Sequence, residues 1–86
     1  MRFMLTVDVV VPPERGQEAA ALVPAERAYV DDQLKLGALE AVYVQDATPA
    51  TRIWAVMRAD SLEDAQEQVA KYPMHEFLRI TYTPIS

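Results

Sequence analysis

Hydrophobic and polar residues alternate at the start of the chain, a pattern typical of a β-strand. In an extended chain the residues fall on two faces, with Phe3, Leu5, Val7 and Val9 on one and Met4, Thr6, Asp8 and Val10 on the other. The segment is rich in β-branched residues, and two prolines follow it. We therefore predict a first strand over residues 2–11.

The spacing changes to that of a helix from about Glu14 to Leu36, where Ala, Glu, Gln and Leu dominate. Gly37 is a natural stop, because glycine readily adopts the left-handed conformation that ends many helices. Pro24 lies inside this segment and has no N–H to donate. It is expected either to kink the helix or to begin a second segment of it.

A hairpin is predicted next. Residues 38–45 (ALEAVYVQ) and 51–59 (TRIWAVMRA) are strand-like, and the turn-like sequence DATPA separates them. Ser61 is followed by acidic residues, which indicates the start of a second helix that continues to Pro73. Residues 77–85 (FLRITYTPI) form the fourth predicted strand.

The order β-α-β-β-α-β predicts a ferredoxin-like α+β fold in one domain over residues 1–86, with two helices on one face of a four-stranded antiparallel sheet. The other face would then expose apolar side chains, either Met4, Thr6, Val10, Val42 and Val44 or the opposite set. Because 51% of the residues are hydrophobic, burial of this face against a second copy is favoured. We predict a homodimer or a higher homo-oligomer.

Composition excludes several classes of function. The net charge is −5 and only eight Lys and Arg residues are spread along the chain, which argues against nucleic acid as a partner. No apolar run approaches the length of a membrane helix, so no membrane partner is expected. The chain has no cysteine and one histidine, so we expect no metal site and a cytoplasmic location.

Several stretches in order carry a family resemblance: PAERAYVDDQLKLG with Glu26 and Gly37, then WAVMRADS at 54–61 and YPMHEFLRI at 72–80. With these, nearly the whole chain resembles the muconolactone isomerase family of the dimeric α+β barrel superfamily. The resemblance implies a dimeric α+β barrel and a cofactor-independent isomerase that shifts a double bond by proton transfer on a lactone or other oxygenated ring.

The chain also departs from that family. The family's enzymes have basic residues on the first two strands, where this chain has Met4, Thr6, Glu40 and Val42. A neutral, apolar substrate suits this loss, so a polyketide cyclase or a cofactor-independent monooxygenase of secondary metabolism is an alternative. A non-catalytic dimer that binds a metabolite is a third.

Glu26 is the first candidate catalytic residue. The apolar stripe of the first helix consists of Ala19, Val23, Val30 and Leu34. Glu26 lies only about 40° from the centre of this stripe. A carboxylate among apolar side chains should have a raised pKa, which suits a group that takes a proton and returns it. Alternatively, Glu26 lies at the edge of the stripe and either reaches solvent or pairs with Arg27 or Arg52.

His75 is the second candidate, because its ordinary pKa suits proton transfer. The alternative is that it closes the turn before the last strand. Five aromatic residues are candidates for lining a substrate pocket, or else belong to the core: Tyr29, Tyr43, Trp54, Tyr72 and Phe77. Tyr29, one turn after Glu26, is best spaced to donate to an enolate oxygen. Arg52 could hold an anion or be a charge at a strand edge.

Overall fold

The chain folds in the predicted order of strands and helices. The computed structural model describes residues 1–86. Its elements are β1 (Arg2–Val9), η1 (Pro13–Arg15), α1 (Gly16–Leu36), β2 (Leu39–Val44), β3 (Arg52–Arg58), α2 (Leu62–Val69), η2 (His75–Phe77) and β4 (Leu78–Ile85), where η marks a 3-10 helix. The strands form one antiparallel sheet in the order β2-β3-β1-β4. The ferredoxin-like α+β fold is thereby confirmed.

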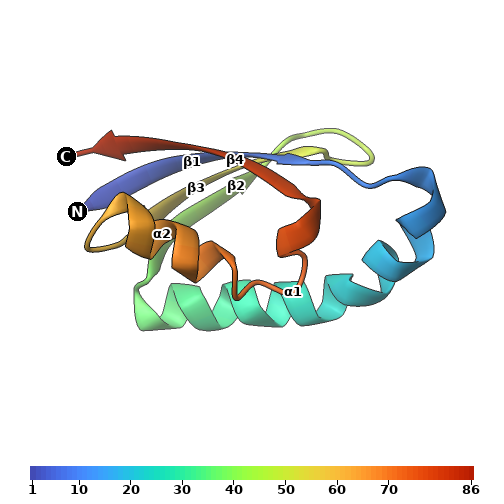
Figure 1. The fold of residues 1–86 in the computed structure, drawn as a ribbon, viewed down its shortest axis with the longest axis horizontal. Helices are drawn as coiled ribbons and strands as arrows, with labels where there is room; N and C mark the ends of the chain where they lie inside the picture. The colour runs from blue at the N-terminus through green and yellow to red at the C-terminus, as the bar shows by residue number, and fades with distance from the viewer.

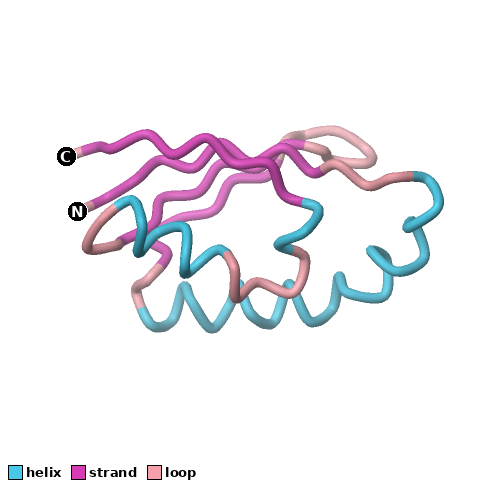
Figure 2. The backbone as a smooth tube through the Cα atoms, in the orientation of Figure 1, coloured by secondary structure: helices cyan, strands magenta, loops and turns pink.

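Both helices lie on the same side of the sheet (Figure 1), and the strands form a single layer above them in this view (Figure 2). In the register, Leu5 of β1 lies opposite Ala55 of β3 and Tyr82 of β4. Residues opposite one another in antiparallel strands point to the same face. Because Leu5 is buried in the core with Phe3, this face is the one that packs on the helices.

A β-bulge changes which side of β2 faces the helices. Leu39 pairs with Met57, but Ala41 pairs with Val56, the next residue along β3, so the alternation shifts between them. After the bulge Val42 lies opposite Ala55, on the helix-covered face. Val44 shares that face. The first expected set placed Val42 and Val44 on the open face together with Met4 and Thr6, and it is wrong for these two valines. One extra residue in a strand reverses every later side chain.

The helix boundaries follow their local chemistry. α1 ends at Gly37, whose φ of 81° lies in the left-handed region that glycine adopts without steric cost. Pro24 lies inside α1, which continues past it as one helix, so a second segment does not begin there. At α2 the Ser61 side chain accepts a hydrogen bond from the Asp64 N–H at 3.0 Å, as an N-cap does. Neither helix combines the length and the apolar character needed to cross a membrane.

Candidate functional site

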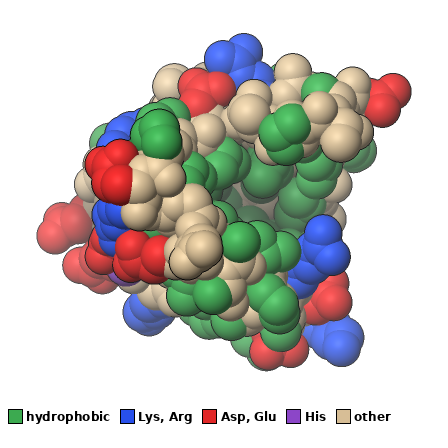
Figure 3. All heavy atoms as spheres, turned by 90° about the vertical axis from the view of Figure 1, so that its right-hand side faces the viewer, with side chains coloured by type: hydrophobic (Ala, Val, Ile, Leu, Met, Phe, Trp, Pro, Cys, Tyr) green, Lys and Arg blue, Asp and Glu red, His purple; other side chains and the backbone are tan.

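A cavity of about 680 Å³ lies between the helix-covered face of the sheet and α1. Seventeen of its twenty-one lining residues are hydrophobic, so it favours a ligand with an apolar body. Figure 3 shows an apolar hollow at the end of the molecule that faces the viewer. Val42, Val44 and Ile53 supply part of the sheet wall, and Val23 and Val30 supply part of the helix wall.

Glu26 is a half-buried carboxyl in this wall. Its Oε1 accepts a hydrogen bond of 3.0 Å from the backbone N–H of Met74, in the segment that joins α2 to η2. Burial raises the pKa of Glu26 above its ordinary value, while the Met74 hydrogen bond and the nearby His75 act in the opposite direction. The inward placement predicted from the helical stripe is confirmed, and Glu26 forms no ion pair with Arg27 or Arg52.

Tyr72 lies in the same cavity wall and is only 8% exposed. Tyr29 packs against it edge to face, with ring centroids 4.7 Å apart. Tyr29 itself is not part of the cavity lining. Of the five aromatic candidates, the structure therefore brings Tyr72 into the cavity with Glu26 and places Tyr29 behind it.

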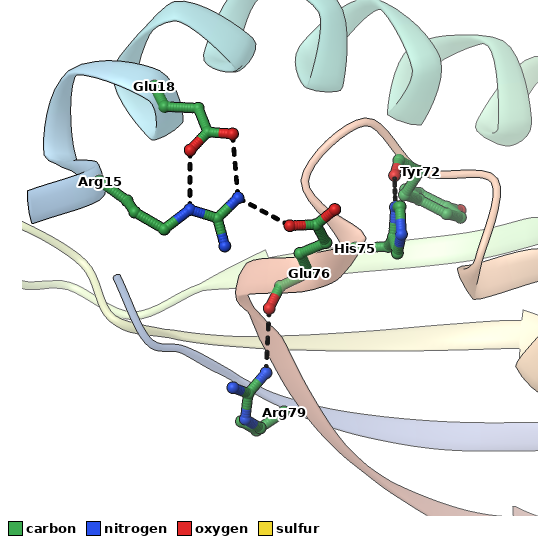
Figure 4. A network of polar contacts seen from close by, with 6 residues as sticks. All are labelled: Arg15, Glu18, Tyr72, His75, Glu76 and Arg79. Atoms are coloured by element: carbon green, nitrogen blue, oxygen red, sulfur yellow. Dashed lines mark hydrogen bonds and ion pairs between the residues drawn. The ribbon is translucent and has the colours of Figure 1, made fainter. Parts of the chain in front are cut away.

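His75 closes the turn between α2 and β4. Its Nδ1 lies 2.9 Å from the backbone carbonyl oxygen of Tyr72, and its backbone N–H donates to the same oxygen at 3.0 Å (Figure 4). Because a carbonyl can only accept, Nδ1 carries the proton in this contact. His75 is exposed and is not part of the cavity lining. Its geometry is that of a residue that stabilises a turn.

The remaining candidates lie outside the cavity lining. Tyr43 pairs with Trp54 and Trp54 with Thr6, so both aromatic residues point to the open sheet face, opposite the helices. Arg52 lies on that face too, where its Nε donates to Asp8 Oδ1 at 2.8 Å. Phe77 is 1% exposed, and the Arg15 guanidinium lies 4.7 Å from its ring centroid. Figure 4 shows how Arg15 also joins Glu18 to Glu76.

Sequence reasoning missed two charged residues of the cavity wall, Arg27 and Asp31. Their spacing carried the signal: Arg27 is four residues after Val23, and Asp31 is four residues after Arg27, so each shares the cavity-facing side of α1. Pro49 and Ala50, in the loop between β2 and β3, also line the cavity. A turn-like composition does not reveal where a loop will lie, so no signal pointed to them.

A second depression, of about 580 Å³, lies beside the ends of β1 and β4. Its arginines, Arg2 and Arg58, both pair with Glu40. No group of three or more potential metal ligands is present in residues 1–86. No known family model matches the chain, and no curated protein is similar to it at a significant level.

Proposed function

We propose that this protein is a small cofactor-independent isomerase, of the muconolactone isomerase type, that moves a proton on an oxygenated ring or lactone. The observation that carries the proposal is Glu26, a carboxyl with a raised pKa in the wall of a largely apolar cavity. Groups perturbed by burial inside a cavity are frequent at catalytic sites. The cavity volume of about 680 Å³ suits a ligand of one or two small rings.

In the proposed reaction the Glu26 carboxylate removes a proton from the carbon beside a carbonyl, which leaves a dienolate. The resulting carboxylic acid returns the proton to a carbon further along the conjugated system, so the double bond moves. Glu26 ends as it began, and no electron acceptor or cofactor is needed. A raised pKa makes the carboxylate a stronger base for the first step, and the same group, once protonated, is the acid of the second step. The Met74 N–H, fixed on Oε1, orients the carboxyl.

A homodimer in the cytoplasm is the proposed working state. Tyr43 is 62% exposed on the open sheet face, beside Trp54. Paired aromatic residues on an exposed sheet face favour burial against another sheet. The absence of cysteine suits a reducing compartment.

A second candidate function rests on the apolar lining. A polyketide cyclase, or a monooxygenase that uses O₂ without a cofactor, would also need a cavity in which hydrophobic residues hold a neutral aromatic ring. Arg27 is the only cation in the lining, which favours a ligand with little negative charge. Oxygen uptake during turnover distinguishes the monooxygenase from the isomerase.

The test is proton exchange in deuterated water, followed by NMR on an unsaturated γ-lactone and on a neutral polycyclic phenol. The wild-type protein should incorporate deuterium beside the carbonyl of the lactone. Glu26→Gln should lower this rate by roughly 10²–10⁴-fold, the usual contribution of a general acid–base group. The fold should persist, because glutamine keeps the shape of the side chain and can remain beside Met74.

His75→Gln is the matched control. It replaces a side chain that lies outside the cavity lining, and the glutamine amide can still donate to the Tyr72 carbonyl. We expect its exchange rate to stay within a few-fold of the wild type. An active Glu26→Gln protein beside an inactive His75→Gln protein would reverse the assignment, and exchange unaffected by either change would remove both residues from the mechanism.

A further inference from the structure

The hydroxyl of Tyr72 is a polar group that nothing in the chain satisfies. Tyr72 is a buried residue, 8% exposed, and its hydroxyl takes part in none of the hydrogen bonds within the chain, although its backbone carbonyl accepts two from His75. No fully buried side-chain oxygen or nitrogen lacks a partner. The hydroxyl must therefore reach open space, and Tyr72 belongs to the cavity lining.

The surroundings of Tyr72 hold the ring in place. Its backbone N–H donates to Val69 at 3.0 Å, and its carbonyl receives both contacts from His75. The Tyr29 ring packs on it edge to face at 4.7 Å. Two residues later, the backbone N–H of Met74 donates a hydrogen bond to the Glu26 carboxylate. One short segment thus positions the Tyr72 ring and the Glu26 carboxyl in the same wall.

We propose that Tyr72 is a further catalytic residue, whose hydroxyl donates a hydrogen bond to the oxygen that gains negative charge when Glu26 removes the proton. The ligand class is a ring with a carbonyl that becomes an enolate, or a phenol that ionises. This inference rests on the proposed isomerase function and adds the group that stabilises the anion. Donors aimed at a developing oxyanion in a site that excludes water contribute strongly to catalysis.

The electrostatics agree with a neutral donor. Burial, followed by Tyr29 and the charge of Glu26, raises the pKa of Tyr72 above its ordinary value. The hydroxyl therefore keeps its proton throughout the neutral range. Tyr72 and Glu26 both line the cavity, so the charge of the carboxyl acts on the phenol.

The test measures binding of a stable oxyanion and needs no turnover. 4-Nitrophenolate mimics the enolate, and nitrobenzene is the matched ring without the charged oxygen. Both are titrated into Glu26→Gln protein, whose neutral side chain does not repel the anion, with and without Tyr72→Phe. Loss of a hydrogen bond to a charged acceptor should weaken 4-nitrophenolate by about 10- to 100-fold. Nitrobenzene binding should change by less than about twofold, because phenylalanine keeps the ring.

Tyr29→Phe in the same background tests the alternative donor, and we expect it to leave 4-nitrophenolate affinity unchanged. The proposal is overturned if Tyr72→Phe weakens both ligands equally, if it weakens neither, if Tyr29→Phe causes the loss instead, or if the cavity binds neither ring. Melting curves of the variants should superimpose, since the hydroxyl has no partner in the chain to lose. If the wild-type protein exchanges no deuterium while Tyr72-dependent binding holds, the isomerase proposal fails and the oxyanion site remains.

Discussion

The two faces of the sheet are built from the same strands but have different properties. On β1, Leu5 lies on the face that the helices cover and is 3% exposed. Its neighbour Thr6 points to the open face and is half-buried. The covered face is apolar and borders the cavity. The open face places Trp54 and Tyr43 beside the Asp8–Arg52 ion pair, a mixture of apolar and charged groups that resembles protein interfaces.

In this 86-residue domain the two faces of the sheet differ in how completely they are packed. A chain this short buries only about 60% of its unfolded surface, yet it leaves a cavity of about 680 Å³ beside its core. The side chains that line it lack packing partners on one side. Packing around Glu26 on the covered face is therefore incomplete, which lowers stability. Burial of the apolar surface of the open face against a second copy would offset this loss of stability.

The largest expected effect comes from truncating one residue on each face. Leu5→Ala removes a side chain from the centre of the core and should lower the free energy of unfolding by about 2–5 kcal/mol. Thr6→Ala, one position along, should cost under about 1 kcal/mol. Urea titrations followed by circular dichroism measure both. Equal costs would mean that the two faces are equally buried in solution, as a dimer with a tightly packed interface would produce.

The second prediction concerns what covers the open face. Light scattering should give a dimer or a multiple of it, and Tyr43→Lys should shift the protein towards monomer at micromolar concentration, because it places a charge in the interface. The folded chain itself should tolerate the lysine, since Tyr43 is 62% exposed. Leu36→Lys is the control: Leu36 is 77% exposed at the end of α1, away from this face. A stable wild-type monomer would remove the barrel arrangement.

The sequence predicted the elements and the inward position of Glu26, because both depend on local spacing. The glycine at the end of α1 and the serine at the start of α2 also carried their signals locally. The bulge in β2 had no local signal in the sequence, because it is a property of the pairing between strands. It moved Val42 and Val44 to the cavity side of the sheet. Spacing along α1 likewise favoured Tyr29 over Tyr72, because Tyr72 comes to share the cavity wall with Glu26 only in the folded chain.

The smallest expected effect is a difference in pH dependence between a carboxyl in the cavity and one outside it. Burial raises the pKa of Glu26 above its ordinary value of 4.5, so the folded state binds this proton more tightly than the unfolded state does. Its contribution to stability is therefore fully present below that ordinary value and is lost as the pH rises through the folded pKa. For exposed Glu18 the hydrogen bond from Arg15 lowers the pKa, so its contribution is present above the ordinary value and is lost as the pH falls.

Glu26→Gln and Glu18→Gln should accordingly change stability with opposite slopes. Between about pH 4 and about pH 7, Glu26→Gln should gain stability relative to the wild type as the pH rises, because the wild type loses the favourable protonated form. Glu18→Gln should lose stability relative to the wild type as the pH rises to the ordinary value of 4.5, and its difference from the wild type should stay constant above that value. Urea midpoints at several pH values, at low and at high salt, measure both slopes. Salt should flatten the Glu18 slope, since that ion pair is exposed, and should change the Glu26 slope little, since desolvation is its main cause. A flat Glu26→Gln slope would mean that solvent fills the cavity well enough to keep Glu26 an ordinary surface carboxyl. A slope that falls with pH would mean that the Met74 hydrogen bond and the charge of His75 outweigh the effect of burial.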